Sequence, residues 1–391
     1  MKEGWEYKKL GDVCDFEGGS QPPKSEWINH PQEGFVRMLQ IRDFTQSRSF
    51  EIEYVKNTKK IRLCKADDIL IGRYGASVGK ILTGLAGAYN VAIIKSIPDE
   101  KVIAKSYIRR YFESSLFQSV LFKVCVSRAA QAGFSKDDIC DALIPVPPLS
   151  EQQSIVDYLD SAFAKIDAMK ANAEKALNEA KALFQASLKE MLEPKEGWES
   201  VKLINIYNFI DYRGATPKKI TEGVPLVTAK NVKLGYIDYT IKDYISEEEY
   251  KQRQSRGISH KGDLLFTTEA PLGNVAIADL ERFSAGQRLI TLQKYKDSKH
   301  EIDNRFYYYY MLGPLFQKKI QSLATGATAL GIKAKILKEV VVPLPTNEDQ
   351  QRIVATLDSL KSKVDRLQAN YDKISQECDA LKQAILRQVF E

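Results

Sequence analysis

The chain has 391 residues, 44% of them hydrophobic, and a formal net charge of +6 from 57 basic and 51 acidic side chains. This length fits about two or three domains, and the apolar content is that of an ordinary globular protein. No apolar run approaches the roughly 20 residues that span a bilayer, and the chain opens without the apolar core of a secretory signal. Its five scattered cysteines favour a reducing compartment over a disulfide framework. We therefore expect a cytoplasmic protein without membrane contact.

Two short motifs occur twice along the chain. Residues 144–156 (IPVPPLSEQQSIV) return as residues 342–354 (VPLPTNEDQQRIV), and the Glu-Gly-Trp-Glu at residues 3–6 returns at residues 196–199. A tandem duplication of a globular head followed by a helix explains both repeats. We expect head 1 at residues 1–148, a first spacer helix at 149–193, head 2 at 194–346 and a second spacer helix at 347–391.

Head 1 has the pattern of short strands separated by polar turns. Residues 36–43 (VRMLQIRD) predict a strand and a turn, and residues 67–75 (DDILIGRYG) predict an acidic turn, a strand and a polar loop that closes at Gly79. This loop is not a phosphate-binding P-loop, because Tyr74 stands where Gly is required and Ile81 where Ser or Thr is required. Residues 109–112 (RRYF) predict a helix with an aromatic face.

In the expected first spacer helix, the spacing of apolar residues indicates the a/d seam of a coiled coil. Its seam residues follow in alternating steps of four and three, with no internal Gly or Pro. At about 1.5 Å per residue the helix spans roughly 60 Å. The predicted seam consists of Ile155, Leu159, Ala162, Ile166, Met169, Ala173, Ala176, Ala180, Leu183 and Ser187.

Head 2 repeats the pattern of head 1 with different loops. Residues 224–231 (VPLVTAKN) align with 36–43, and residues 262–270 (GDLLFTTEA) align with 67–75 and lead to a loop that closes at Gly273. In residues 305–310 (RFYYYY) aromatic side chains occupy consecutive helical positions. Such side chains point all round a helix, so we expect most of them to be packing residues and not a base-stacking platform.

The second spacer helix carries a seam of the same phase. Alanines crowd the first seam where larger residues fill the second, which favours packing of one helix on the other. If the duplication is a spatial two-fold, the helices run antiparallel. The expected fold is α+β: two mixed α/β heads joined by two long helices that form an antiparallel coiled-coil spacer, with an internal pseudo-two-fold repeat. The second seam consists of Ile353, Leu357, Leu360, Val364, Leu367, Tyr371, Ile374, Cys378, Leu381 and Ile385.

The sequence lacks the motifs of common catalysts. None of the three histidines has ligand spacing to a cysteine or to another histidine, and no Cys-x-x-Cys pair occurs, so we expect no metal site. A nucleophile elbow, a zinc-protease motif and a dinucleotide fingerprint are also missing from the sequence, and so is an Asn-Pro-Pro-Tyr loop of the sort that adenine methyltransferases use on a flipped base. We expect no catalysis by the chain itself. Any single basic cluster is better explained as a solvated charged face, but the confinement of all of them to the heads favours a polyanionic partner. These clusters are residues 59–62, 109–110, 218–219, 318–319 and 333–335.

The duplicated heads, the two Pro-rich hinges that end in Gln-Gln, and the Glu-Gly-Trp opening of each half resemble the DNA specificity subunits of type I restriction–modification systems. The resemblance covers essentially the whole chain. It implies that each head is a target recognition domain, that the two heads read the halves of a split site in double-stranded DNA, and that the helices set the gap. Roughly 60 Å of helix corresponds to an upper bound of about 17 base pairs. Because the head loops differ, we expect a non-palindromic, bipartite site.

The resemblance also implies partner subunits. Two modification (methyltransferase) subunits would bring S-adenosylmethionine, and restriction (motor-nuclease) subunits would bring ATP hydrolysis with Mg²⁺. We expect neither cofactor to bind this chain. The exposed faces of the spacer helices and hinges are the expected docking surface.

In this family the loop after the Asp-x-Leu strand and the segment before each hinge carry much of the DNA contact. Arg73 suits bidentate readout of guanine and Gln131 that of adenine, whereas Lys80, Lys333 and Lys335 suit phosphate. Glu269 suits either a bond from cytosine N4 or capping of its own loop. The candidates in head 1 are Arg73, Tyr74, Ser77, Lys80, Arg128, Gln131, Ser135 and Lys136, and those in head 2 are Thr267, Thr268, Glu269, Asn274, Thr325, Thr328, Lys333 and Lys335.

Two other classes of protein stay open. A coiled-coil scaffold would assemble proteins without touching DNA, and salt-dependent retention on duplex DNA separates it from a DNA reader. A self-sufficient restriction–methylation enzyme would cleave or methylate DNA alone, which the missing motifs disfavour.

Overall fold

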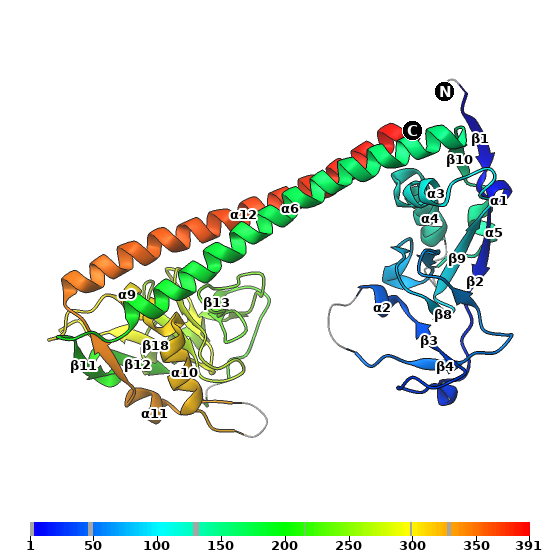
Figure 1. Ribbon diagram of the computed structural model, residues 1–391. Helices are drawn as coiled ribbons and strands as arrows, with labels where there is room; N and C mark the ends of the chain where they lie inside the picture. Colours follow the sequence, from blue (N-terminus) through cyan, green and yellow to red (C-terminus); the bar gives the residue numbers. More distant parts are fainter. Residues whose placement is uncertain (1–3, 46–49, 128–132, 215, 298, 327–329) are drawn as a thin grey trace. The chain divides into compact units, whose positions relative to one another are not determined.

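The computed structural model describes residues 4–45, 50–127, 133–214, 216–297, 299–326 and 330–391. The chain forms two compact units (Figure 1). Unit 1 contains residues 1–172 and 372–391, and unit 2 contains residues 173–371. Among the described residues, no helix is both long enough and apolar enough to cross a membrane.

Head 1 is built from two small sheets and a layer of helices. The first sheet has the order β2 (Cys14–Gly18), β9 (Ile93–Pro98), β6 (Ile69–Gly72) and β7 (Ile81–Leu82), all antiparallel. The second has the order β4 (Tyr54–Lys56), β3 (Phe35–Leu39), β8 (Gly87–Tyr89) and β5 (Leu63–Cys64), with β3 and β8 parallel. The remaining elements are β1 (Glu6–Lys9) paired with β10 (Leu143–Val146), and the helices α1 (Leu10–Val13), α2 (Ile41–Thr45), α3 (Lys105–Glu113), α4 (Ser115–Ser127) and α5 (Asp137–Cys140).

Strand β6 is apolar along its whole length because both of its faces are covered. Ile69 and Ile71 point into the cluster that α3 and α4 complete, whereas Leu70 points to the opposite face, where Leu39 and Tyr89 of the second sheet pack. Alternating side chains of a strand face opposite sides of a sheet. A central strand between two layers therefore needs apolar residues at every position.

Unit 2 repeats this architecture. Its first sheet has the order β12 (Tyr207–Asp211), β18 (Leu289–Lys294), β15 (Leu264–Thr267) and β16 (Val275–Ile277), which matches the first sheet of head 1 strand for strand. Where head 1 has β5, head 2 has the helix α8 (Glu247–Arg253). The internal repeat is thereby confirmed. The other elements are β14 (Tyr244–Ile245), β13 (Val224–Val227) and β17 (Ser284–Ala285), β11 (Glu199–Lys202) paired with β19 (Val341–Leu344), and α7 (Leu203–Ile206), α9 (Asn304–Leu312), α10 (Pro314–Ser322) and α11 (Ala334–Lys338).

The tyrosine run of α9 is a packing element, as predicted. All four tyrosines from Tyr307 to Tyr310 are buried, and a buried phenol keeps a hydrogen-bond partner for its hydroxyl. The Tyr307 hydroxyl donates to the Pro343 carbonyl at 3.0 Å, and the Tyr308 hydroxyl donates to the Gly235 carbonyl at 2.7 Å. Tyr309 reaches Asp358 at 2.6 Å. These phenols tie α9 to its surroundings in unit 2.

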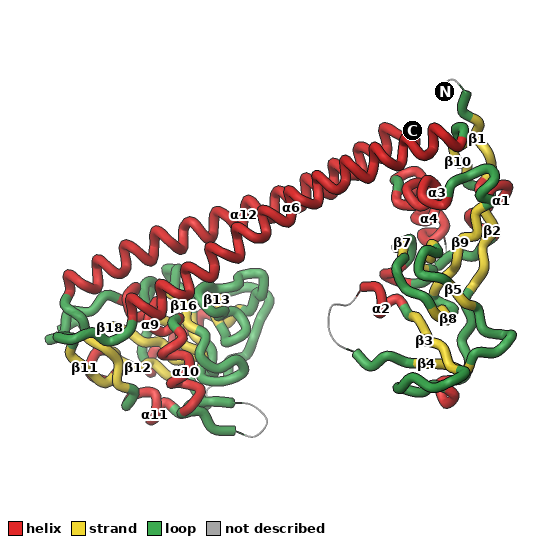
Figure 2. Tube along the Cα trace, in the orientation of Figure 1, coloured by secondary structure: helices red, strands yellow, loops and turns green. Residues whose placement is uncertain are grey.

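The helices α6 (Leu149–Leu192) and α12 (Asn347–Phe390) each run unbroken for 44 residues (Figure 2). Within unit 1 they are antiparallel, because Asp167 pairs with Lys382 at 2.6 Å while Lys170, further along α6, pairs with Asp379 at 3.5 Å. Within unit 2, Lys181 donates to Gln368 at 2.7 Å. The Leu188 side chain shares the core cluster of unit 2 with Leu357, which again makes the two helices antiparallel.

The predicted seam of α6 is correct from Ile155 to Ile166, and further along the helix it is wrong at Met169, Ala176 and Leu183, which are exposed. Leu159 and Ile166 are buried as expected, but Met169 and Leu183 are each 59% exposed. The seam instead passes through residues one position later, and Leu177 is its buried member in the middle of the helix. Large side chains fill a helix interface better than alanine does. The partner seam on α12 follows the prediction except at Leu381, which is exposed; the last predicted member, Ile385, again packs against the core of unit 1.

A buried glutamine fixes the first hinge to head 1. The Gln152 side chain is fully buried, and its Oε1 accepts a hydrogen bond from the Ala104 backbone N–H at 2.7 Å. Its Nε2 donates to the carbonyls of Val102 at 3.0 Å and Pro147 at 2.8 Å. One side chain thus satisfies three backbone groups at the point where α3 and α6 both begin.

The second hinge uses the same device. Gln350 is fully buried, accepts from the Asp303 N–H at 2.8 Å and donates to the carbonyls of Glu301 and Pro345, both at 3.0 Å. The second glutamine of each motif, Gln153 or Gln351, is exposed. The Gln-Gln repeat therefore contains one structural residue and one surface residue.

We expect Gln152→Ala to lower the free energy of unfolding by about 2–3 kcal/mol, because it leaves buried backbone groups without partners. Gln153→Ala is the matched control and should change it by less than about 0.5 kcal/mol. Urea unfolding followed by circular dichroism measures both variants. Equal losses in the two variants would contradict the role assigned to Gln152.

Candidate nucleic-acid interface

The polar loop of head 1 occupies residues 73–80, between β6 and β7. Its ends are held together because the Gly72 N–H donates to the Lys80 carbonyl at 2.9 Å and the Gly79 N–H donates to the Gly72 carbonyl at 3.0 Å. The Ser77 hydroxyl donates to the Tyr74 carbonyl at 2.6 Å. The backbone of this loop is therefore pinned from within, while the side chains at its tip remain exposed.

A glutamine on α4 holds the closing glycine of this loop. The Gln118 Nε2 donates to the Gly79 carbonyl at 2.9 Å and to the Phe112 carbonyl at 2.7 Å. Gly79 has φ +77°, and a Cβ at this position would lie 2.4 Å from Gln118 Oε1. Glycine is thus required both by its backbone conformation and by the close approach of Gln118.

Head 2 contains the same clamp. The Gln317 Nε2 on α10 donates to the carbonyls of Gly273 and Met311, both at 2.7 Å. Our sequence interpretation missed both glutamines. A signal was present, because Leu-Phe-Gln occurs at residues 116–118 and again at residues 315–317.

The structure brings the two predicted DNA-contacting segments of each head together. Tyr74 in the loop of head 1 forms a β-bridge with Gly133, which belongs to the segment before the hinge, and Glu269 in head 2 forms the equivalent bridge with Gly331. These segments lie about 60 residues apart along the chain in each head. The backbones of the two segments that carry candidates therefore meet within each head.

Arg73 and Tyr74 lie at the exposed edge of head 1. The Arg73 guanidinium donates to the Phe134 carbonyl at 3.2 Å and, more weakly, to the Val91 carbonyl at 3.4 Å, and it lies 5.1 Å from the Tyr74 ring. Tyr74 is 43% exposed. Carbonyl groups orient this cation without neutralising it. An oriented guanidinium that forms no ion pair with a described carboxylate is suited to binding an acceptor edge or a phosphate.

The other candidates of head 1 divide into surface and structural positions. Lys80 is exposed. Ser135 precedes α5, and its hydroxyl and its N–H both donate to the Asp138 carboxylate. Lys136 pairs with Asp15, and this hydrogen bond lowers the pKa of the Asp15 carboxyl. Arg128 and Gln131 lie outside the described residues, so their predicted contacts stay predictions.

In head 2, the side chains of three candidates bond to backbone groups of the same head. Thr267 and Thr268 are buried, and their hydroxyls bond to the backbone of Asn274 and to the Arg288 carbonyl respectively. The Asn274 amide donates to the Val232 carbonyl at 2.9 Å. These side chains support the loop in this structure, and whether they also contact DNA stays a prediction.

The remaining candidates of head 2 lie at its surface. Glu269 pairs with Arg288, with 3.1 Å between Oε1 and Nε. Thr325 is exposed and exchanges backbone hydrogen bonds with Gly331. Lys333 and Lys335 are exposed at the start of α11. Thr328 lies outside the described residues.

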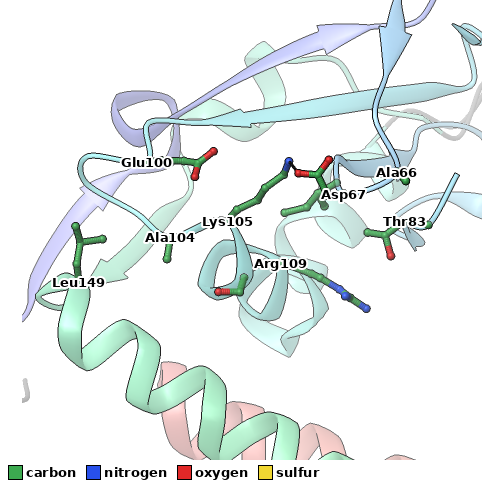
Figure 3. A pocket seen from close by; sticks show the side chains of 11 residues that line it. Ala66, Asp67, Thr83, Glu100, Ala104, Lys105, Arg109 and Leu149 are labelled. Carbon is green, nitrogen blue, oxygen red and sulfur yellow. Dashed lines mark hydrogen bonds and ion pairs between the residues drawn. The ribbon is translucent and has the colours of Figure 1, made fainter. Parts of the chain in front are cut away.

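A pocket of about 610 Å³ lies elsewhere in unit 1, between α3, the turn before β6 and the start of α6 (Figure 3). Its charges are partly compensated, because Lys105 Nζ lies 2.8 Å from Asp67 Oδ2. Glu100 and Arg109 also line it, but none of the candidate DNA contacts does. Across the described part of the chain, no group of three or more His, Cys, Asp or Glu residues is arranged to hold a metal ion.

Comparison with known proteins identifies the family. The type I restriction modification DNA specificity domain matches residues 2–179 and again residues 195–376. The specificity subunit of the type I restriction enzyme MjaVIII from Methanocaldococcus jannaschii is 24% identical over 388 residues, covering 93% of this chain and 88% of its own length. The EcoKI specificity subunit of Escherichia coli is 23% identical over 421 residues, covering 100% of this chain and 89% of its own length. The chain therefore belongs to the type I restriction modification DNA specificity family, with two copies of its domain.

Solved structures share the fold. A chain from a study of complex assembly and conformational transition of the type I R-M system superposes with a TM-score of 0.74 at 20% identity, over 99% of this chain and 98% of its own. The HsdS subunit from Thermoanaerobacter tengcongensis superposes with a TM-score of 0.57 at 18% identity, over 100% and 97%. The predicted fold class is confirmed.

Gln118→Ala should release the loop of head 1. Loss of the bond to Gly79 should speed amide exchange in residues 72–80 by about fivefold, because one hydrogen bond contributes about 1 kcal/mol. Ser119→Ala, an exposed change on the same helix, is the control. Hydrogen exchange read by mass spectrometry should show no change in the loop of head 2. Unaltered exchange in the Gln118 variant would rule out the clamp.

Proposed function

We propose that this chain reads a split, asymmetric site in double-stranded DNA and directs separate methyltransferase and motor-nuclease subunits to it. The observation that carries the proposal is the duplicated surface at which a clamped loop meets the segment before the hinge. Both heads build this surface with the same backbone bridges and the same glutamine clamp. Two equivalent surfaces in one chain suit two half-sites.

The two surfaces differ in the side chains that they present. Arg73 and Thr268 occupy equivalent positions after β6 and β15, and Tyr74 and Glu269 follow them as the bridging residues. A guanidinium and a phenol offer donors, whereas a carboxylate only accepts. Different hydrogen-bonding groups select different base edges in the major groove. The half-sites are therefore expected to differ in sequence.

The long helices set the distance between the half-sites in this proposal. Helices α6 and α12 are unbroken, contain neither Gly nor Pro, and pack on each other inside each unit. Helices of this kind bend little compared with loops. A fixed gap between half-sites follows from a stiff connection.

The chemistry belongs to partner subunits in this proposal. Two methyltransferase subunits bring S-adenosylmethionine, restriction subunits bring ATP hydrolysis with Mg²⁺, and all act in the cytoplasm. The exposed faces of α6 and α12, together with the surface residues of the hinges such as Gln153, are the proposed docking surface. The matched hinges suit a symmetric pair of methyltransferase subunits.

Methylation patterns test the proposal. The chain is expressed with its companion subunits in a host that lacks other modification systems, and the genome is sequenced with detection of methylated bases. The expected result is one split motif of fixed gap that vanishes when this chain is omitted. Absence of any motif that depends on this chain, or DNA binding without salt dependence, would favour the scaffold alternative. Methyl transfer or cleavage by the pure chain would favour a self-sufficient enzyme.

We expect Arg73→Ala to relax sequence choice within one half-site, at one or two base pairs, by about 10- to 100-fold, because it removes a base-edge donor. Lys80→Ala, which alters an exposed residue of the same loop, should lower affinity for all sequences alike. Competition binding on a panel of single-base-pair variants measures both effects. A uniform loss in the Arg73 variant would instead make Arg73 a phosphate contact.

A further inference from the structure

Head 2 carries an arginine, Arg288, that lies outside the loop after β15 but next to it, immediately before the neighbouring strand β18. In head 1 the Arg73 N–H donates to the Ala92 carbonyl at 2.9 Å, and in head 2 the Thr268 N–H donates to the Arg288 carbonyl at 3.1 Å. At the end of the β6–β9 pair, Arg73 is therefore opposite Ala92. At the end of the equivalent β15–β18 pair, Thr268 is opposite Arg288. Each head has one arginine in this pair, but on opposite strands.

The guanidinium of Arg288 is oriented and accessible. Its Nε lies 3.1 Å from Glu269 Oε1, and the two side chains are 56% and 48% exposed. Neither terminal nitrogen of Arg288 donates a hydrogen bond to any described residue. This ion pair with Glu269 restrains the Nε side of the guanidinium, and both terminal nitrogens stay available to an external acceptor pair.

The surroundings of Arg288 are basic. With Lys219 and Lys230 it lines a pocket of about 230 Å³, and the polar side chains of Thr216, Thr228 and Gln287 complete the polar part of the wall. Of the described residues that line this pocket, none carries a carboxylate. Lys219 pairs with Asp243 at 2.5 Å, whereas Lys230 is exposed and forms no ion pair with a described residue. Cations beside an oriented guanidinium match the phosphates that flank a base edge.

The turn that carries Arg288 is held by hydrogen bonds from the buried side of head 2. Arg253, which is buried in head 2, donates to the Ala285 carbonyl at 2.7 Å and to the Ser284 hydroxyl at 3.0 Å. Its guanidinium also lies 4.5 Å from the Tyr212 ring. The turn itself is closed because the Gly286 N–H donates to the Val227 carbonyl at 2.7 Å. A reading side chain needs a rigid support of this kind.

We propose that Arg288 is the specificity-determining arginine of head 2 and that it reads a guanine through O6 and N7, with Glu269 as its positioning residue. This inference rests on the proposed function, since it names a reader within the second half-site. It assigns Glu269 a third role beside the two expected from the sequence, because a carboxylate paired with Arg288 positions a donor and does not itself bind cytosine. Bidentate pairing of arginine with guanine supplies strong discrimination among base pairs.

Three variants and one control test the proposal in the full complex with methyltransferase subunits. Arg288→Ala removes the reader, Arg288→Lys keeps the charge without the planar pair of donors, and Glu269→Gln removes the orienting carboxylate. Arg282→Ala is the control, because Arg282 is an exposed arginine of the same head that pairs with Glu247. Methylation rates are measured on duplexes in which each base pair of the site is replaced in turn.

Arg288→Ala and Arg288→Lys should both reduce discrimination at one G·C pair of the second half-site by about 10- to 100-fold. Glu269→Gln should reduce it at the same pair by a smaller factor, with the unfolding temperature unchanged. Discrimination in the first half-site, and all discrimination by the Arg282 variant, should stay as in the parent protein.

Three outcomes overturn the inference. They are unchanged discrimination by Arg288→Ala, a uniform loss on every duplex with a shallower salt dependence, which marks a phosphate contact, or relaxed choice at different base pairs in the Arg288 and Glu269 variants. Each leaves the proposed function standing if the parent protein still selects a split site. A parent protein that selects no such site overturns both.

Discussion

At each hinge, the Pro-rich turn lies beside the residues that begin a shorter helix of the same head. The buried backbone N–H and C=O groups of these two segments need hydrogen-bond partners. A single buried glutamine satisfies three of them in each half, Gln152 in one and Gln350 in the other. A buried donor or acceptor without a partner destabilises a fold by about 1–3 kcal/mol. The start of each long helix, and hence its direction relative to its own head, depends on this amide.

In the two candidate DNA-binding loops, the contacts that hold the backbone are the same and the exposed side chains differ. Gln118 and Gln317 hold the closing glycines of equivalent loops, and the bridges at Gly133 and Gly331 join each loop to the segment before the hinge. These contacts involve backbone groups, so they tolerate any exposed side chain at the loop tip. Sequence choice can therefore change through residues such as Arg73 or Arg288 without loss of the framework.

The two heads also show that equivalent surfaces need not use equivalent positions. Head 1 places its guanidinium on the residue that follows β6, and head 2 places one on the residue that precedes β18, across the same backbone hydrogen bond. Adjacent strands lie about 5 Å apart, which is less than the reach of an arginine side chain. An alignment of one loop with the other compares Arg73 with Thr268 and does not reveal Arg288.

The sequence by itself determined the duplication, the hinges, the two long helices and the packing role of the tyrosines, because these depend on repeats, on periodicity and on the absence of Gly and Pro. It also placed the loop that follows β6 and its counterpart after β15. Only the tertiary structure decided which residues in the middle of α6 face α12. Leu177 is buried there and the predicted neighbour Ala176 is exposed. The tertiary structure also decided that Thr267 and Thr268 point inward and that Glu269 meets Arg288. Those facts depend on contacts between strands that are distant in sequence, and such contacts leave no local pattern.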